Sequence, residues 1–544
     1  MACVPVATAP ACSAPPLPEG PCPVCPRLAV EFEPWRQAGY WKAQHQRALE
    51  REALLRQENE QLRAQLRLRE QQLFGRKTET GAAAIPTTAH QTAAPPRRRG
   101  QQRGHKGPRR RDYSHLPVVV EEHELPADQR CCQHCHRPFA PVSGTEDSTI
   151  LEIEVKAHRR LIRRHRYRPT CACGVHPGIV TAPPAPRVVA KSLLGVSLLV
   201  ELLVDKYLSY RPTYRLLADL KTRDVDLSLG TVTDALQRLL PLFEPVYEAL
   251  AAYSRQQPLW HGDETRWLVF ATVEGKVGFR WYLWVFHAAQ VVVFVLAQGR
   301  AHDVPEQYLG PKAEGIMVVD RYKAYQAINQ VKTGHIVLAF CWAHVRRDFV
   351  THARTWPEQE GWALSWVERI GQIYQYNDER LAVVEEPAAF AVADARLRAA
   401  VTALGTQGEA ELADPQLHPA RRKVLESLGN HWTGLTVFVE HPEVPMDNNT
   451  AERAQRGPVV GRKNYYGSGA VWAGRLAAMM FSLLQTLCLW NLNPRAWLTA
   501  YLTACAEAGG GPPEEVERFL PWNLSAEDRC HWSLAGAKDD KDTS

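Results

Sequence analysis

The feature that most constrains the fold is a change in sequence pattern near residue 257. Residues 183–256 have the apolar spacing of helices, whereas the following segment carries short runs of aromatic and β-branched residues, which favour strands. The expected strands are Leu259–His261, Arg280–His287, Val291–Leu296, Gly315–Val319 and Ile336–Phe340. Residues 355–440 return to a polar helical pattern, as though inserted. This pattern predicts a multidomain protein of mixed α+β and α/β class.

The last part of the pattern runs from Met446 to Trp490 and predicts a helix, a loop and a long apolar helix. No uninterrupted apolar stretch approaches the ~20 residues that span a bilayer. The best candidate, Ser192–Val200, is expected to be part of a buried helix. The first residues lack a basic start and an apolar run, so no secretory signal is expected. We therefore expect a cytoplasmic protein without membrane association.

A strong helix composition marks residues 35–75, which contain no Pro and are dense in Glu, Gln, Arg and Leu. Four leucines fit alternating core positions of a heptad, with Asn59 on the same seam; they are Leu55, Leu62, Leu66 and Leu73. A polar Asn at such a position commonly fixes register and oligomeric state. The pattern predicts a dimeric coiled coil, and the alternative is an amphipathic helix packed on its own protein.

Positive charge is concentrated in one segment, although the net charge of the chain is only +6. Residues 97–111 contain no acid and eight cations: Arg97, Arg98, Arg99, Arg103, Lys106, Arg109, Arg110 and Arg111. Eight cations in fifteen residues repel one another unless a polyanion neutralises them, so this segment is expected to contact nucleic-acid phosphates. The alternative is a solvated spacer.

Cysteine usage points to metal binding, because 13 Cys is an odd number and several lie in close pairs. Cys132 and Cys135 form a C-x-x-C pair, and Cys171 and Cys173 form a C-x-C pair. Two runs between them, Ile150–Val155 and Arg160–Tyr167, are expected to form a hairpin that brings the pairs together. Four thiolates in tetrahedral geometry would hold a structural zinc ion. Cys131 could replace Cys132, and the alternative is a small β-module with free thiols.

A helix pair precedes the strand-rich region and resembles a helix-turn-helix. Its helices are expected at Tyr214–Leu220 and Thr231–Leu240, with Leu229 and Gly230 in the turn and Thr231 as N-cap. This pair could read DNA. A plain helical bundle explains the same pattern.

Two acids follow expected strands. Asp263 comes after Leu259–His261 and Asp320 directly follows the buried run Gly315–Val319. A carboxylate at the end of such a strand lies at the rim of the sheet, where α/β proteins place reactive groups. The third acid is Glu452, one turn inside a helix that Asp447 or Asn448 could cap.

Glu452 shares its helix face with Asn449, Arg453 and Arg456, because these residues follow i, i+3, i+4 and i+7 spacing. Alone, this face could be a row of surface ion pairs. Together with Asp263 and Asp320, it predicts a carboxylate cluster. Such oxygen ligands suit Mg²⁺ or Mn²⁺, and two ions about 3.5–4 Å apart support phosphoryl transfer.

At this point the chain resembles the insertion-sequence sixty-six family of transposases. The strings that carry the resemblance are HGDETRW at 261–267, DRYKAY at 320–325, CWAHVRRDF at 341–349, DNNTAERAQR at 447–456, GRKNYYGS at 461–468 and ERFLPWNL at 517–524. The resemblance implies an RNase H-like mixed-sheet core in which Asp263, Asp320 and Glu452 are the catalytic DDE triad. It also implies cleavage that exposes 3′ ends of transposon DNA, followed by strand transfer to a target.

Further residues are expected to support this chemistry. Cys341 and His344 have the spacing of a metal half-site, with no second pair close by in the sequence, so they are expected to pack and hydrogen-bond beneath the active site; a zinc site is the alternative. Asn448 and Asn449 are also expected to support the site, and Glu264 and Asp348 to be supporting or structural. The proposed DNA-contacting cations of the core are Arg346, Arg347, Arg453, Arg456, Arg462 and Lys463.

The expected organisation has nine segments. They are a disordered N-terminus at 1–34, a coiled-coil helix at 35–78, a basic linker at 79–115, a zinc-binding module at 116–182, a helical domain at 183–256, the two parts of the core at 257–354 and 441–504, a helical insertion at 355–440 and a C-terminal tail at 505–544. The expected partners are double-stranded DNA of transposon ends and target, a second copy of the chain, and accessory proteins of the same element.

Three other functions fit parts of the sequence. A catalytically silent DNA-binding regulator would keep the scaffold, although it leaves an intact acidic triad unused. An oligomerising structural protein would use the coiled coil and would leave the three acids unexplained. Another RNase H-like nuclease would cut DNA without joining it.

Overall fold

The computed structural model describes residues 25–74, 118, 120, 134, 137–138, 155–167 and 179–534, without the side chains of 25–36 and 70–74. The chain divides into two compact units. One consists of residues 1–90 with 350–365, and the other of residues 91–349 with 366–544. Each unit is described by itself.

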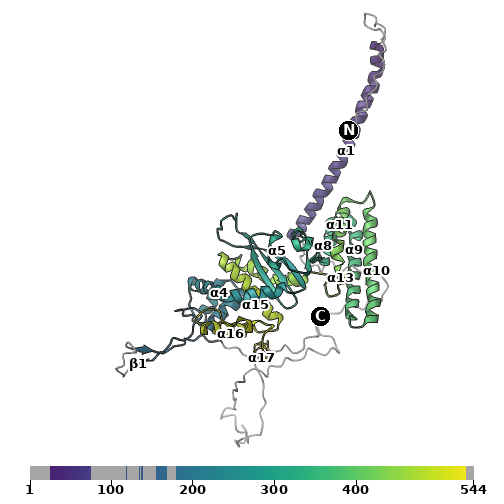
Figure 1. The fold of residues 1–544 in the computed structure, drawn as a ribbon. Helices are drawn as coiled ribbons and strands as arrows, with labels where there is room; N and C mark the ends of the chain where they lie inside the picture. The colour runs from purple at the N-terminus through teal and green to yellow at the C-terminus, as the bar shows by residue number, and fades with distance from the viewer. Residues whose placement is uncertain are drawn as a thin grey trace, which may run out of the picture. The chain divides into compact units, whose positions relative to one another are not determined.

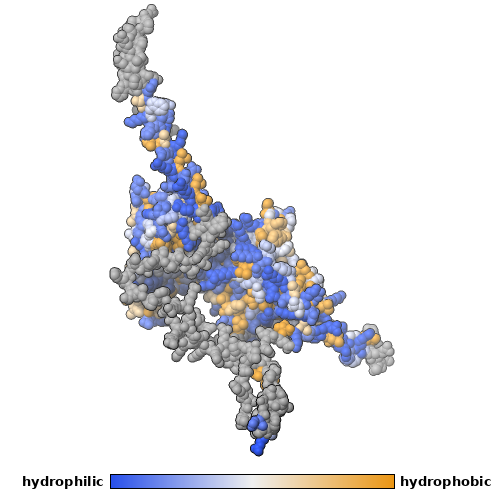
Figure 2. All heavy atoms as spheres, turned by 180° about the vertical axis from the view of Figure 1, so that it is seen from behind, coloured by the Kyte–Doolittle hydropathy of each residue, from blue (hydrophilic) through white to orange (hydrophobic). Residues whose placement is uncertain are grey.

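The first unit contains the long helix α1, Cys25–Phe74. It begins ten residues before the expected boundary, so the expectation of disorder is wrong for residues 25–34, where Leu, Ala and Glu favour a helix. Leu55, Leu62 and Leu66 are all more than half exposed. Figure 2 shows α1 as a mostly hydrophilic surface with hydrophobic residues spaced along it. These three leucines of the expected seam are therefore exposed, and the side chain of the fourth, Leu73, lies outside the described residues.

In the second unit three helices precede the central sheet, namely α2 Val196–Tyr207, α3 Thr213–Lys221 and α4 Leu229–Arg255. The expectation that Ser192–Val200 forms one helix is wrong at its start, since α2 begins at Val196. The N-cap of α4 is Ser228 and not Thr231, because Ser228 Oγ accepts a hydrogen bond from the Thr231 amide at 3.1 Å.

The core of this unit is a five-stranded mixed sheet of order β5-β4-β3-β6-β7. Its strands are β3 Leu259–Leu268, β4 Arg280–His287, β5 Val292–Ala297, β6 Gly315–Val319 and β7 Ile336–Phe340. β3, β4 and β5 pair antiparallel, and β3, β6 and β7 pair parallel. The expected bounds of β4, β6 and β7 are confirmed.

The apolar helix α15, Val471–Leu489, packs against the edge strand β5 and against α4 (Figure 1). Two of its hydroxyls accept hydrogen bonds from β5 amides. Ser482 Oγ lies 2.7 Å from the Phe294 nitrogen and Thr486 Oγ1 lies 3.1 Å from the Val292 nitrogen. These bonds satisfy amides that an edge strand would otherwise expose.

By length and composition α15 is also the one helix of the described residues that could cross a membrane, and 67% of its apolar window is buried inside the protein. It is longer than Ser192–Val200, which the sequence favoured. Its contacts with β5 and α4 are those of a core helix.

Short helices connect β5 to β6 and β6 to β7, and longer helices follow β7. The connecting helices are α5 Asp303–Leu309, α6 Lys323–Gln326 and α7 Asn329–Lys332, and α8 Trp342–Thr355 follows β7. Between α8 and the helix α14, Asn449–Tyr465, the chain forms η3 Pro357–Gln359, α9 Glu360–Ala382, α10 Pro387–Leu412, α11 Pro419–Asn430, α12 Trp432–Leu435 and α13 Val437–Glu440. In Figure 1, α9, α10 and α11 run alongside one another.

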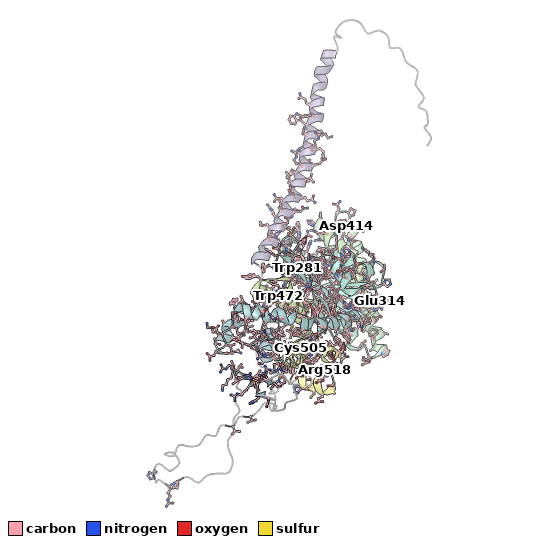
Figure 3. The ribbon with its side chains drawn as sticks, turned by 60° about the vertical axis from the view of Figure 1, so that its left-hand side comes forward. Trp281, Glu314, Asp414, Trp472, Cys505 and Arg518 are labelled. Carbon is pink, nitrogen blue, oxygen red and sulfur yellow. The ribbon has the colours of Figure 1, made fainter. Side chains whose placement is uncertain are left out.

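Three more elements of the second unit follow α15. They are α16 Pro494–Glu507, η4 Val516–Phe519 and α17 Ala526–Trp532. Figure 3 labels Cys505 of α16 and Arg518 of η4 in this region. The Trp497 indole donates a hydrogen bond to the Phe519 carbonyl at 2.8 Å, and both side chains are buried.

Only fragments of the cysteine-rich region are described. The short strand β1, Arg166–Tyr167, pairs antiparallel with β2, Val180–Thr181. The expected strand Arg160–Tyr167 is therefore wrong in extent, because only its end, Arg166–Tyr167, is a strand and pairs with β2. Residues 150–154 of the other expected strand lie outside the described residues. The four proposed zinc ligands Cys132, Cys135, Cys171 and Cys173, and the alternative Cys131, lie outside the described residues.

Candidate active site

Asp263 and Asp320 lie on adjacent parallel strands. The register pairs His261 of β3 with Val318 of β6, so two residues further along each chain Asp263 comes beside Asp320. Asp320 directly follows β6, as expected. The expectation that Asp263 ends its strand is wrong: β3 continues to Leu268, because antiparallel pairing with β4 extends it through a polar stretch.

The first turn of α14 carries Glu452, and Asn448 fastens that turn to the sheet. The Asn448 side-chain amide donates to the Gly262 carbonyl at 2.7 Å, and its oxygen lies 3.2 Å from His261 Nδ1. Its backbone amide donates to Cys341 Sγ at 3.2 Å. Asn448 is 1% exposed. It therefore joins β3, the start of α8 and α14 next to the three acids.

Asn449 begins α14, and its amide donates to Asp447 Oδ1 at 2.9 Å. Asn448 occupies the N-cap position, but its side chain makes no cap hydrogen bond. The sequence left the choice between these two residues open: Asp447 supplies the side-chain hydrogen bond at the helix start, and Asn448 attaches the start of the helix to the sheet.

The three acids share one electrostatic environment. Burial raises the pKa of Asp263 and, together with the charges of Glu264, Asp320 and Glu452, brings it to about 8. The Asp320 Oδ1 atom accepts a hydrogen bond from the Tyr322 amide at 2.9 Å. Glu452 Oε1 is buried and has no hydrogen-bond partner among the described atoms. Each carboxylate therefore disfavours the charged form of its neighbours, and a cation bound between them would relieve this repulsion.

Glu264, the neighbour of Asp263, is surrounded by a cation and a hydroxyl donor instead of other acids. Its side chain is 1% exposed and forms an ion pair with Arg300, while the Tyr325 hydroxyl donates to its second oxygen at 2.6 Å. Arg300 also stacks on the Tyr322 ring with its guanidinium 3.8 Å from the ring centroid. This network holds the loop after β6, on which Asp320 lies.

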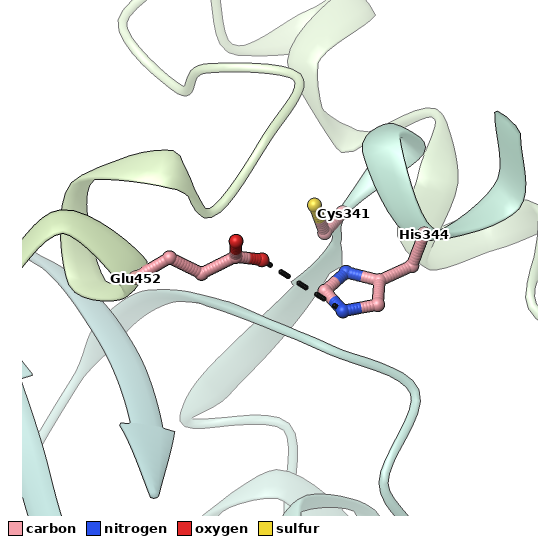
Figure 4. Close-up of side chains that lie close together, drawn as sticks. All are labelled: Cys341, His344 and Glu452. Atoms are coloured by element: carbon pink, nitrogen blue, oxygen red, sulfur yellow. Dashed lines mark ion pairs between the residues drawn. The ribbon is translucent and has the colours of Figure 1, made fainter. Parts of the chain in front are cut away.

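Cys341 and His344 meet Glu452, as Figure 4 shows. One ligand atom of each of these three residues lies within 4.8 Å of the others. His344 Nε2 is 3.7 Å from Glu452 Oε1, and Cys341 is buried directly after β7. Burial lowers the pKa of His344, helped by Arg347, against the raising effect of Glu452 and Asp320. Glu452, the third residue of this cluster, is thus distant in sequence from Cys341 and His344.

The remaining α8 residues surround this group. Asp348 forms an ion pair with Arg321, whose other guanidinium nitrogen donates to Ser427 Oγ at 2.8 Å. Arg347 is exposed and Arg346 is half-buried. The acid Asp348 therefore has a structural partner.

The cations of α14 differ in what they contact. Arg453, Arg456 and Lys463 are exposed. Arg462 donates to Thr265 Oγ1 at 2.9 Å and to the Arg266 carbonyl, so it joins α14 to β3. After it, Tyr465 packs edge-on against Trp267 and Tyr466 is 69% exposed.

The structure thus brings Asp263, Asp320 and Glu452 to one side of the sheet. The proposed phosphate-contacting residues Arg97, Arg98, Arg99, Arg109, Arg110 and Arg111 lie outside the described residues. Sequence reasoning missed Arg300, Tyr325 and His261. Tyr325 lies within the string DRYKAY and could have been singled out there, whereas nothing in the local sequence marks Arg300.

Residues 191–476 match the family described as Transposase IS66 family, which covers the whole sheet, the inserted helices and α14. A mixed sheet with three facing acids and a match over more than half of the chain define the class of protein. The chain belongs to the IS66 family of transposases.

Three proteins of Sinorhizobium fredii strain NGR234 are similar over most of their length. The protein y4jD is 28% identical over 433 residues, which cover 76% of this chain and 81% of the relative. The protein y4hP is 25% identical over 489 residues, covering 84% and 83%. The protein y4qI is 26% identical over 467 residues, covering 82% of each. All three are described as uncharacterized.

Proposed function

We propose that this transposase binds the ends of an insertion sequence, cleaves them to expose 3′ hydroxyls and transfers these strands to target DNA, with Asp263, Asp320 and Glu452 as its catalytic acids. The observation that carries the proposal is their convergence. Asp263 and Asp320 lie side by side in register, and the charge of Glu452 acts on Asp263. The chain brings these acids together from positions up to 189 residues apart, since 452 − 263 = 189.

We also infer that the sheet is an RNase H-like core. Three antiparallel strands continue into two parallel ones, with Asp263 in β3 and Asp320 directly after β6. The long helices α9 and α10 interrupt this core between β7 and α14. This arrangement supports the fold that the family resemblance implies.

The residues present fit divalent cations of the Mg²⁺ or Mn²⁺ class. The three acids offer the oxygen ligands that these ions prefer. Glu452 Oε1 is a buried acceptor without a hydrogen-bond partner among the described residues, and the pKa of Asp263 is raised, so a bound cation would stabilise its charged form. Two such ions held by Asp263, Asp320 and Glu452 would activate an attacking oxygen and stabilise a leaving one.

Other residues of the chain position this site. Asn448 holds α14 against β3, so that Glu452 stays near Asp263. The network of Glu264 and Arg300 holds the loop of Asp320. Arg453 and Arg456 on the exposed side of α14 are proposed to contact the DNA backbone, because their charges lie next to the acids.

The function is tested by incubating the full chain with DNA of the element's own ends and Mg²⁺. We expect new 3′ ends and joined products with the wild type, and neither product with Asp320→Asn. Cutting without joining would support a different nuclease. End binding without cutting by either protein would support a silent regulator.

The basic segment is proposed to contribute binding that does not depend on sequence. Replacing the arginines at 97–99 and 109–111 by Gln should weaken DNA binding for all sequences and flatten its salt dependence, because each phosphate contact releases counterions. The helix pair α3 and α4 is proposed to read the ends through the exposed first turn of α4. An unaltered salt slope would exclude phosphate contact by the basic segment.

The exposed leucine seam of α1 supports a dimer formed through a coiled coil. Removing residues 1–78 should halve the mass measured by light scattering and leave the sheet folded. Unchanged mass would exclude the seam as the interface.

Three further assignments complete the proposal. The four cysteines Cys132, Cys135, Cys171 and Cys173 are proposed to hold one structural Zn²⁺. Accessory proteins of the same element are proposed as partners. The cytoplasm is the proposed location, because the DNA substrate lies there in bacteria.

A further inference from the structure

The cluster of Cys341, His344 and Glu452 has the composition of a second metal site. Its donors are a thiol, an imidazole and a carboxylate, all within 4.8 Å of one another. Mg²⁺ prefers oxygen ligands, whereas Zn²⁺ takes mixed sulfur, nitrogen and oxygen donors. The donor set therefore suits a different class of cation from the one proposed for the three acids.

Two atoms of the cluster lack partners. His344 Nδ1 and Glu452 Oε1 are buried, and neither has a hydrogen-bond partner among the described residues. Buried polar atoms are normally satisfied, so the unpartnered Glu452 Oε1 beside His344 Nε2 points to a missing ligand. His344 Nε2 and Glu452 Oε1 lie 3.7 Å apart, too far for a hydrogen bond and close to the separation of two ligands on one small cation.

The surroundings also suit a bound thiolate. The Asn448 amide donates to Cys341 Sγ at 3.2 Å, an outer-shell contact of the kind that orients metal ligands. The side chains of His344 and Glu452 are 27% and 31% exposed, which leaves an entry path and room for a solvent ligand. Figure 4 shows the Glu452 carboxylate directed towards the His344 ring from the opposite helix.

We propose that Cys341, His344 and Glu452 bind one Zn²⁺-class cation and that this binding withdraws Glu452 from the Mg²⁺ site. Glu452 belongs to both ligand sets, and Cys341 and His344 hold its carboxylate on the α8 side. Zn²⁺ is therefore an inhibitor of the enzyme. The inhibition rests on the function proposed above, whereas the binding does not.

Binding is tested without DNA, using the full chain freed of metal and titrated with Co²⁺ as a coloured substitute for Zn²⁺. We expect wild type to bind one more Co²⁺ than Cys341→Ser, with a difference spectrum showing sulfur-to-cobalt charge transfer. His344→Gln should weaken this same site at least about tenfold, since even outer-shell changes have that effect. Cys530→Ser, at an exposed cysteine of α17, is the control and should match wild type.

Identical Co²⁺ spectra and stoichiometry for wild type, Cys341→Ser and His344→Gln would overturn the site. The inhibition is measured separately as the fraction of Mg²⁺-dependent end cleavage that survives added Zn²⁺. Half-inhibition should need at least about tenfold more Zn²⁺ in His344→Gln than in wild type. Equal Zn²⁺ sensitivity would overturn the inhibitory role. A wild type without cleavage would defeat the proposed function and leave the Co²⁺ result to decide the site.

Discussion

Arg380 in the inserted helices and Asp263 in the sheet are both ionisable groups withdrawn from water, but their surroundings differ. Arg380 is fully buried and donates to Asp394 at 2.9 Å, to Asn377 at 2.7 Å and to the carbonyls of Val439 and Phe438 at 3.0 and 2.9 Å. Its charge is balanced by the protein itself. Such a network stabilises one arrangement of α9, α10 and α13.

Asp263 has no comparable balance. Its nearest charges are Glu264, Asp320 and Glu452, and all three raise its pKa. At Asp394, burial would also raise the pKa, but hydrogen bonds from Arg398 and Arg380 lower it overall. The comparison shows how the two regions differ: the Arg380 charge is paired with an acid of the protein, although its Nε atom has no hydrogen-bond partner among the described residues, whereas acids that raise one another's pKa suit a bound cation.

The largest expected effect comes from the acids. Asp263→Asn and Glu452→Gln should each reduce end cleavage more than about a hundredfold, because even outer-shell changes at metal sites cost about 10–100-fold. End-DNA binding should be retained, because it rests on cations elsewhere. Gel-shift and cleavage assays on the same preparations measure both. If a variant loses both DNA binding and cleavage, its melting curve is compared with that of the wild type to show whether the variant is misfolded.

The next largest effect is expected on stability, at the buried hydrogen-bond network of Arg380. Arg380→Met should lower the free energy of unfolding by about 1–3 kcal/mol, because the Asn377 side-chain oxygen and the Phe438 carbonyl lose their donor, whereas Asp394 keeps its hydrogen bond from Arg398. Arg396→Met is the matched control, since Arg396 forms an exposed ion pair with Glu379 and should cost less than about 1 kcal/mol. Urea unfolding followed by tryptophan fluorescence measures both. Equal losses would show that burial of the network contributes nothing.

The smallest effect on end cleavage is expected at Glu264. This residue is the neighbour of Asp263 in β3, but it is paired with a cation, as Arg380 is with an acid. Glu264→Gln removes an ion pair, but Arg300 is 40% exposed and recovers hydration. Unfolding free energy should fall by about 1–2 kcal/mol, and end cleavage by less than about tenfold. Cleavage as low as that of Asp263→Asn would place Glu264 among the catalytic acids.

The sequence predicts some of these features and cannot predict others. β6 and β7 have their expected bounds, because each is a short β-branched run between polar residues. β3 is longer than expected because residues 263–266 are polar, and only pairing with β4 makes them a strand. Asp263 therefore lies inside a strand, although its place beside Asp320 follows from the same parallel register.

Beyond the three acids, the sequence does not predict which residues of distant segments meet at the site. The spacing of Cys341 and His344 suggests half of a metal site, yet its third member is Glu452, 108 residues further from His344 (452 − 344 = 108). Arg300 lies in a loop whose local sequence carries no signal, and only the fold brings it to Glu264. Periodicity reports which face of an element is buried, and it does not report which elements meet there.

The central claim is that Asp263, Asp320 and Glu452 form a cluster of carboxyl groups that binds divalent cations. Its most direct test is the melting temperature of metal-free protein with and without Mn²⁺, measured for wild type and Asp320→Asn. A cation that binds only the folded state raises the melting temperature. The account predicts a Mn²⁺-dependent rise in wild type that disappears in Asp320→Asn and persists in Arg396→Met. The same rise in Asp320→Asn as in wild type would contradict it.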